Sequence, residues 1–309
     1  MAKPEQQTGK GTPATTDVAG YLNELLTQLG HYARLMRLDR PIGIWLLLWP
    51  TLWGLWIAAK GHPHSSIFAV FVAGVVIMRS AGCVFNDFAD RKLDPQVART
   101  RDRPLASGAV SPVEALVLCG VLLLIALALA TTLNTLTLQL SLGAAALTLL
   151  YPFAKRLFAA PQMILGAAFG WAIPMAFAAE TGEVPQLAWL MWLAVLIWAV
   201  IYDTMYAMAD REDDLKAGIK STAILFGELD VYIIGLLQIV FILALKLIGE
   251  QAMLGGWYSL ALIAVTGMMA YQFYSIRSRE PEKCFNAFLQ NRYVGAIVFT
   301  GIMLSYSLI

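Results

Sequence analysis

Two short segments of related sequence hold most of the side chains that could do chemistry. The first is residues 86–94 and the second is residues 202–214, and each contains the pattern Ala-Asp-Arg-x-x-Asp. Each segment follows a long apolar run and leads into a loop rich in arginine and lysine. This arrangement indicates a diverged internal repeat that places carboxylates at the ends of two helices.

The spacing of the acids suits the binding of divalent cations. Asn86, Asp90 and Asp94 are four residues apart, as are Asp210 and Asp214, so each set should project from one face of a helix. Such all-oxygen donors suit Mg²⁺, which prefers one or two carboxylates completed by phosphate oxygens and water. We therefore predict that these five residues bind Mg²⁺ and grip a diphosphate. The alternative, solvated helix ends paired with nearby Arg and Lys, explains one motif better than two copies.

Three basic residues are candidates for contacts with the phosphates. Arg103 follows the first motif, Lys155 ends the fourth apolar run, and Lys220 follows the second motif. Cations converging on a diphosphate would stabilise the charge on its departing oxygens. For any one of them alone, the usual excess of Arg and Lys in the cytoplasmic loops of membrane proteins is a sufficient explanation.

Arg79 and Asp203 lie one heptad before Asn86 and Asp210, which places them roughly 10 Å deeper along their helices at 1.5 Å per residue. Ionisable residues at membrane depth are costly and are usually functional. One hypothesis is that the two residues pair with each other as a structural link. The other is that Arg79 binds an anionic acceptor and Asp203 takes or relays its proton.

The elements that position these residues are membrane helices. Apolar residues make up 59% of the 309 positions and charged residues only 14%, against about half and a quarter in soluble proteins. Three distant cysteines form neither a disulfide framework nor a metal motif, and the net charge of +1 gives no reason to expect nucleic acid. Runs of about 20 apolar residues span a bilayer. The predicted spans are 41–59, 66–88, 113–130, 133–151, 161–179, 187–209, 229–248, 254–275 and 292–309.

These spans predict an all-α polytopic protein with a transmembrane domain at 41–309. Pro50 and Pro174 fall inside their spans and predict kinks in both helices. Gly166 and Gly170 have the small-xxx-small spacing of a close helix contact. Residues 1–20 are polar and predict a disordered tail, and residues 21–40 predict an amphipathic helix in the membrane interface.

Charge orients the bundle. Arg and Lys gather in alternate loops, which places those loops and the amino terminus in the cytoplasm and the carboxyl terminus outside.

The motifs resemble those of the UbiA-type intramembrane aromatic prenyltransferases. Asn-Asp-x-x-Asp-x-x-x-Asp at 86–94, followed by Arg-Pro-Leu at 103–105, is similar to their first signature, and residues 202–227 are similar to their second. The run Pro-Ile-Gly-Ile-Trp-Leu-Leu-Leu-Trp-Pro-Thr at 41–51 and Lys-Ser-Thr at 220–222 resemble the 4-hydroxybenzoate polyprenyltransferase branch. The likeness covers the chain from about residue 34 onward.

The resemblance implies a nine-helix bundle around a central cavity capped by the two acidic loops. It implies Mg²⁺ and a polyprenyl diphosphate, often octaprenyl in bacteria, with prenylation of 4-hydroxybenzoate at carbon 3 during ubiquinone biosynthesis at the inner membrane, among membrane lipids. Asn86, Asp90, Asp210 and Asp214 match metal–diphosphate positions, with Asp94 beside them, and Asp203 matches a proposed acceptor-side residue.

Three alternatives are left open by the sequence. The acceptor could be another aromatic compound, such as dihydroxynaphthoate, homogentisate or haem. Intramembrane acids also line the ion paths of transporters, although a repeated motif at helix ends on one side favours an enzyme. A structural membrane subunit would have no activity to lose when its acids are replaced.

Overall fold

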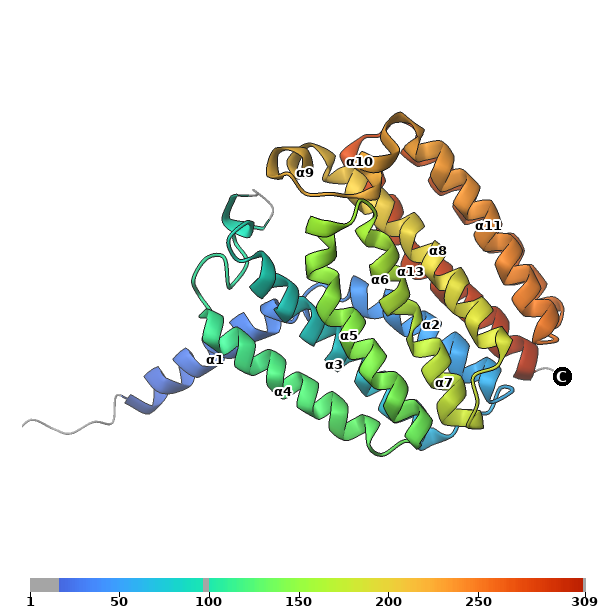
Figure 1. Ribbon diagram of the computed structural model, residues 1–309, viewed down its shortest axis with the longest axis horizontal. Coiled ribbons are helices and arrows are strands. Elements are labelled where there is room, and N and C mark those ends of the chain that lie inside the picture. Colours follow the sequence, from blue (N-terminus) through green and yellow to red (C-terminus); the bar gives the residue numbers. More distant parts are fainter. Residues whose placement is uncertain (1–16, 97–99, 308–309) are drawn as a thin grey trace, which may run out of the picture.

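The computed structural model of the chain describes residues 17–96 and 100–307. Every element in these ranges is a helix (Figure 1). The α-helices are α1 (Asp17–Leu35), α2 (Ile42–Ala58), α3 (Ser65–Asp90), α4 (Pro112–Ala130), α5 (Thr135–Leu157), α6 (Pro161–Gly170), α7 (Ala172–Thr181), α8 (Gln186–Ala209), α9 (Arg211–Ala217), α10 (Thr222–Phe226), α11 (Asp230–Gln251), α12 (Gly256–Ile276) and α13 (Pro281–Ser307). Two 3₁₀ turns are η1 (Asp94–Gln96) and η2 (Gly227–Leu229).

The helical, polytopic fold class is confirmed. Eight helical segments in the described ranges are long and apolar enough to cross a bilayer, with α6 and α7 forming one of them and residues 222–251 another. α2 is a ninth, shorter apolar helix of 17 residues. These nine segments lie at the positions predicted from hydropathy.

The fifth span is broken at Trp171, which separates α6 from α7. Pro174 lies three residues beyond the break and has no amide proton to donate to the carbonyl of Gly170, four residues earlier, so the regular helix stops there. α6 packs closely on α8, because a Cβ added at Gly166 would lie 2.7 Å from the Leu196 carbonyl oxygen. One added at Gly170 would lie 3.0 Å from the Trp192 ring. The kink predicted at Pro174 and the close helix contact are both confirmed, whereas α2 continues through Pro50 as one helix.

Two predictions about where helices extend are wrong, and each has a local cause. α3 ends at Asp90, so Asp94 does not continue its face; Asp94 precedes Pro95, and the residue before a proline avoids the helical conformation. α8 ends at Ala209, as predicted, and Asp210 joins it to the separate short helix α9, which begins at Arg211. α13 begins at Pro281, a favourable first helical position, well before the predicted residue 292.

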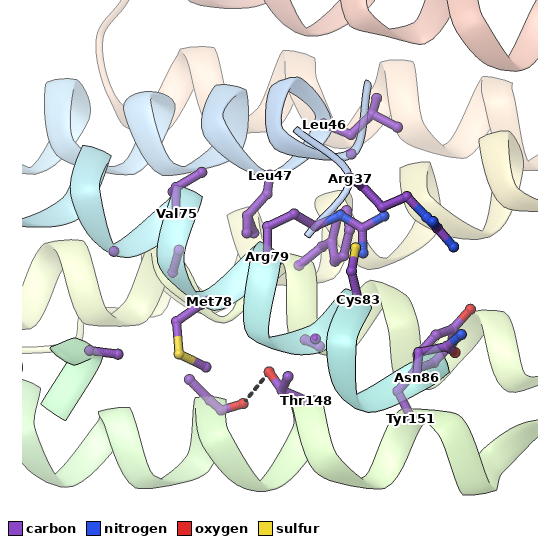
Figure 2. A pocket seen from close by; sticks show the side chains of 18 of the residues that line it. Arg37, Leu46, Leu47, Val75, Met78, Arg79, Cys83, Asn86, Thr148 and Tyr151 are labelled. Carbon is purple, nitrogen blue, oxygen red and sulfur yellow. Dashed lines mark hydrogen bonds between the residues drawn. The ribbon is translucent and has the colours of Figure 1, made fainter. Parts of the chain in front are cut away.

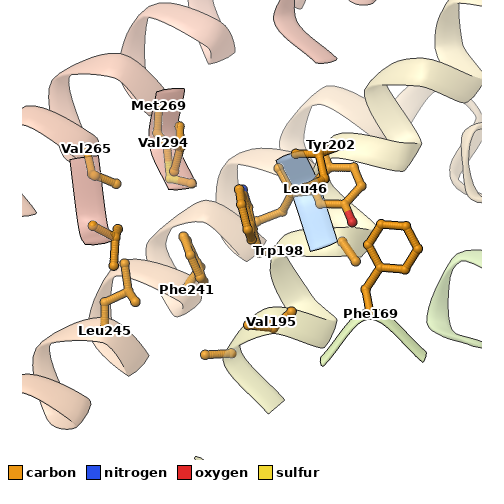
Figure 3. Close-up of a cluster of buried hydrophobic side chains, with 14 of the residues drawn as sticks. Leu46, Phe169, Val195, Trp198, Tyr202, Phe241, Leu245, Val265, Met269 and Val294 are labelled. Carbon is orange, nitrogen blue, oxygen red and sulfur yellow. The ribbon is translucent and has the colours of Figure 1, made fainter. Parts of the chain in front are cut away.

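The buried apolar side chains of the described residues form one large cluster and two smaller ones, of which the smallest joins α2, α3 and α7. The large cluster joins α2 with α6–α8 and α10–α13, and stacked rings of Trp53, Trp198 and Phe241 lie at its centre (Figure 3). The second cluster joins α3, α4 and the end of α1 around Leu35 and Val84. The acidic segments lie at the same end of the bundle, where α9 and the loop after α3 are seen (Figure 1).

α1 extends away from the bundle and exposes apolar side chains (Figure 1). It begins at Asp17, inside the segment predicted to be a disordered tail, and it ends at Leu35, short of residue 40. The rest of that tail, residues 1–16, lies outside the described residues. Leu22, Leu25 and Leu26 are each more than half exposed, as expected for a helix whose apolar face meets a lipid surface. Its place in the membrane interface stays a prediction.

Candidate active site

A cavity of about 930 Å³ lies inside the helical bundle. Apolar side chains of α2–α8 form most of its wall, and Arg37, Arg79, Asn86 and Tyr151 lie among them (Figure 2). Asn86 and Asp87 reach it from α3, while Asp203 and Tyr206 reach it from α8. Residues of both acidic segments therefore line one cavity.

Asp87 is the most buried carboxylate of the first segment, with 1% of its surface exposed. Arg37 Nη2 lies 2.9 Å from Asp87 Oδ2, and Arg103 Nη1 lies 2.9 Å from Asp87 Oδ1. Arg37 comes from the turn after α1, where its φ of 59° is left-handed, and Arg103 comes from the loop before α4. Asp87 thus ties two distant segments to the end of α3.

Asp94 shares Arg103 with Asp87. Arg103 Nη1 lies 3.1 and 2.9 Å from the two carboxylate oxygens of Asp94, and the Thr100 hydroxyl donates to the Asp94 backbone carbonyl at 2.8 Å. Burial raises the pKa of the Asp94 carboxyl above its ordinary value, and Arg103 opposes that rise. Burial works to lower the pKa of Arg103, but attraction to Asp87 and Asp94 outweighs it and raises that pKa. Arg103 is therefore held charged and in a fixed position.

Asp90 lies at the last turn of α3, where it meets α5. Arg156 Nη2 approaches Asp90 Oδ1 at 3.3 Å and donates to the Ala89 carbonyl at 2.7 Å. Asp90, Asp203 and Tyr206 all act electrostatically on the hydroxyl of Tyr151, which lines the cavity. The first motif and α8 therefore converge on Tyr151, as predicted for two facing acidic segments.

The second segment is built differently. Asp210 joins α8 to α9, and the Asp214 amide donates to the Asp210 carbonyl at 2.9 Å, so both acids lie on one turn of α9. Gly218, with φ of 67°, ends this helix in the left-handed conformation. Lys220 follows, is exposed, and donates to the Leu157 carbonyl at 3.4 Å.

The basic candidates are placed unequally. Arg103 lines the cavity, whereas Lys220 lies on the surface of the protein beside the end of α5. The backbone of Lys155 belongs to α5, but its side chain lies outside the described residues.

Arg79 and Asp203 both line the cavity, below the acidic segments. The Arg79 guanidinium carbon lies 5.8 Å from the ring centroid of Phe169. It also fills the space left by Gly43 on α2, where any Cβ would collide with the guanidinium. The structural link between Arg79 and Asp203 and their acceptor-side roles both stay predictions.

Sequence reasoning missed Asp87 and Arg37 as members of the site. Asp87 could have been found, because Ser80, Cys83, Val84 and Asp87 form a buried stripe at helical spacing on α3. Arg37 was assigned only to the amphipathic helix, and nothing in the local pattern links it to a residue 50 positions away.

The donors present fit Mg²⁺ when phosphate oxygens complete its coordination. In the described part of the chain, no three His, Cys, Asp or Glu side chains are grouped to hold a metal by themselves. Of the five predicted metal ligands, all of them within the described residues, only Asn86 lines the cavity. Asp90, one turn further along α3, and Asp210 and Asp214 at the start of α9 could supply the one or two carboxylates per ion that Mg²⁺ takes from proteins.

Comparison with known proteins agrees with this architecture. Residues 47–297 match the UbiA prenyltransferase family. The chain is 55% identical over 272 residues to a 4-hydroxybenzoate octaprenyltransferase of Saccharophagus degradans, an alignment covering 88% of this chain and 91% of the relative. A UbiA homolog from Aeropyrum pernix K1 superposes with a TM-score of 0.75 at 26% identity, covering 84% of this chain and 97% of that one.

A UbiA homolog from Archaeoglobus fulgidus bound to GPP and Mg²⁺ has the same fold. It superposes with a TM-score of 0.73 at 20% identity, over 90% of this chain and all of that one. The comparisons give no support to the alternatives of a transporter or a purely structural subunit. The family match covers most of the chain, and the chain therefore belongs to the UbiA prenyltransferase family.

Proposed function

We propose that the protein transfers a polyprenyl group, octaprenyl by analogy with its relatives, from polyprenyl diphosphate to carbon 3 of 4-hydroxybenzoate. The observation that carries this proposal is the single cavity, apolar along its length and lined at one end by residues of both acidic segments. The similarity to 4-hydroxybenzoate octaprenyltransferases supports the choice of acceptor and donor. The product is a precursor in ubiquinone biosynthesis.

The reaction breaks the bond between the allylic carbon and the diphosphate oxygen and forms a carbon–carbon bond ortho to the acceptor hydroxyl. Diphosphate leaves with the bonding electron pair, and the ring loses one proton. Mg²⁺, when bound, neutralises the diphosphate and so favours its departure. We propose that Asn86, Asp90, Asp210 and Asp214 hold the metal. Asp94 keeps its predicted place beside them, with a second role in orienting Arg103.

Basic residues complete the diphosphate site in this proposal. Arg103 is fixed by two carboxylates and lines the cavity, so its remaining donors are preorganised to meet phosphate oxygens. Lys155 and Lys220, on the segments beside the second motif, are proposed to contact the outer phosphate. Such prepositioned charges stabilise a leaving group without reorganising during the reaction.

The deeper part of the cavity is the proposed acceptor site. Arg79 would pair with the carboxylate of 4-hydroxybenzoate, leaving the phenol hydroxyl directed toward the diphosphate. Asp203, one heptad below Asp210, would accept the ring proton after attack. The apolar walls would exclude water that could otherwise quench an allylic cation.

This function requires a lipid-soluble donor and a membrane location. We propose that the protein lies in the bacterial inner membrane with its amino terminus in the cytoplasm, as the distribution of arginine and lysine among the loops predicts. The isoprenoid tail would then enter from the lipid, and the aromatic acid from the cytoplasm.

Purified protein in lipid nanodiscs, supplied with labelled 4-hydroxybenzoate, Mg²⁺ and a series of polyprenyl diphosphates, tests the proposal. We expect a prenylated acid, with activity lost on chelation and restored by Mg²⁺. Parallel reactions with dihydroxynaphthoate, homogentisate and haem are the controls. Reaction of one of these acceptors in place of 4-hydroxybenzoate would overturn the choice of acceptor, and full activity in excess chelator would overturn the metal assignment.

A further inference from the structure

One residue that lines the cavity carries a buried hydroxyl group without a partner among the described residues. Tyr202 on α8 is 2% exposed, and its hydroxyl has no hydrogen-bond partner among the described residues. Other buried polar atoms of the described chain also lack partners, but of these only the Tyr202 hydroxyl belongs to a residue that lines the cavity. An unpaired polar group in an apolar wall destabilises the protein unless a ligand satisfies it.

The ring of Tyr202 is fixed by its neighbours. It packs edge-on against Trp198, with centroids 5.4 Å apart and planes at 86°, and lies 6.2 Å from Phe288. Figure 3 shows its hydroxyl end directed away from Trp198 and toward Phe169. A phenylalanine would make the same ring contacts, so packing alone does not account for the hydroxyl.

The hydroxyl lies beside the proposed acceptor site. Phe169, toward which it points, carries the Arg79 guanidinium against its ring. Arg79 and Asp203 are also among the groups that act electrostatically on the Tyr202 hydroxyl. A carboxylate bound by Arg79 would therefore have a neutral donor on its other side.

We infer that Tyr202 is an acceptor-binding residue whose hydroxyl donates a hydrogen bond to the carboxylate of the aromatic substrate. The inference rests on the proposed function and assigns one more residue to its acceptor site. Hydrogen bonds to an ionised acceptor are stronger than neutral ones. Arg79 neutralises the charge of the substrate carboxylate, and the hydrogen bond from Tyr202 fixes the rotation of the substrate about its long axis. The ring carbon beside the phenol hydroxyl therefore faces the prenyl donor.

The test is Tyr202→Phe in nanodiscs, with Tyr258→Phe as the matched control. Tyr258 is equally buried at 2%, but it lies outside the cavity and its hydroxyl donates to the Leu245 carbonyl at 2.9 Å. For Tyr202→Phe we expect a KM for 4-hydroxybenzoate about tenfold higher, equivalent to about 1.4 kcal/mol. The KM for the prenyl diphosphate and the melting temperature should not fall. Tyr258→Phe should lower the melting temperature and leave both KM values unchanged.

Two dead-end probes identify the group that Tyr202 contacts. Benzoate has the carboxylate without the phenol, and phenol has the reverse. Inhibition by benzoate should weaken about tenfold in Tyr202→Phe, and inhibition by phenol should not change. Equal weakening of both, or an unchanged KM for 4-hydroxybenzoate, would overturn the inference.

Calorimetric binding of benzoate separates this inference from the proposed function, because it needs no turnover. A protein that prenylates a different carboxylate acceptor should still bind benzoate more weakly as Tyr202→Phe. Benzoate binding that is the same in wild type and Tyr202→Phe would overturn the inference even if 4-hydroxybenzoate is prenylated.

Discussion

The two acidic segments share a sequence pattern but are held in different ways. In the first, Asp87 and Asp94 are buried and bound to Arg37 and Arg103, which come from distant parts of the chain. In the second, the acids lie on the short helix α9, which has no fully buried residue. The arginine of this segment, Arg211, pairs with Asp230 at the start of α11. The repeated motif therefore places carboxylates at both segments, but different contacts hold those carboxylates in place.

The arginines at the matching position of the repeat show this divergence most clearly. Arg91 lies over the ring of Phe88, 4.2 Å from its centroid, within its own segment. Arg211 instead pairs with the fully buried Asp230 at the start of α11, as does Arg279 at 2.9 Å. The first segment, residues 86–94, forms a first rim that is held by ion pairs of its own carboxylates. The second segment, residues 202–214, forms a second rim that is held through Arg211 by Asp230, a carboxylate outside the segment.

Replacing one metal-site acid in each segment tests whether the two rims do the same work despite their different support. We expect Asp90→Ala and Asp210→Ala each to reduce kcat for prenyl transfer about 1,000-fold, because each removes charge that would hold Mg²⁺ and the diphosphate. The measurement is steady-state transfer of a labelled polyprenyl group in nanodiscs, with folding checked by melting temperature. Normal activity in either variant would show that only one segment takes part.

Breaking the support of the first rim should cost stability as well as activity. Asp87→Ala leaves Arg37 and Arg103 largely buried without their shared carboxylate, and we expect a loss of about 3 kcal/mol in the free energy of unfolding. Denaturant unfolding in mixed micelles measures it. Asp102→Ala is the control, because that side chain is 86% exposed and 3.9 Å from Arg101. Equal stability of the two variants would contradict the view that the first rim is held by its own carboxylates.

The contrast between the two rims also marks what sequence could predict. Hydropathy located the nine apolar segments, because lipid demands long uninterrupted runs of apolar residues. The acidic motifs located the charged end of the cavity. The position of Asp94 off the face of α3 was missed, because Pro95 ends regular structure inside a motif whose spacing suggested a continuous helix. The pairing of Arg37 with Asp87 and of Arg211 with Asp230 was missed because tertiary packing brings these residues together.

The support of the second rim should be weaker than that of the first. Asp230→Ala removes the carboxylate shared by Arg211 and Arg279, which are 25% and 38% exposed, against 23% and 19% for Arg37 and Arg103. Water can therefore solvate the released charges better, and we expect a loss of about 2 kcal/mol in the free energy of unfolding. Loosening of α9 should raise the KM for polyprenyl diphosphate and leave that for 4-hydroxybenzoate unchanged. A larger loss than for Asp87→Ala would reverse the proposed difference between the rims.

The smallest effect should come from an acid that belongs to the second segment by sequence alone. Asp213 is nearly half exposed and lies 3.8 Å from Lys216, three residues later on the same helix. Exposed pairs of this kind contribute about 0–1 kcal/mol, because water and salt screen them. Asp213→Ala should therefore change neither the melting temperature nor kcat measurably, whereas its neighbour Asp214→Ala should lower kcat. If Asp213→Ala abolished transfer while Asp214→Ala did not, the metal-facing side of α9 would be the opposite of the one proposed.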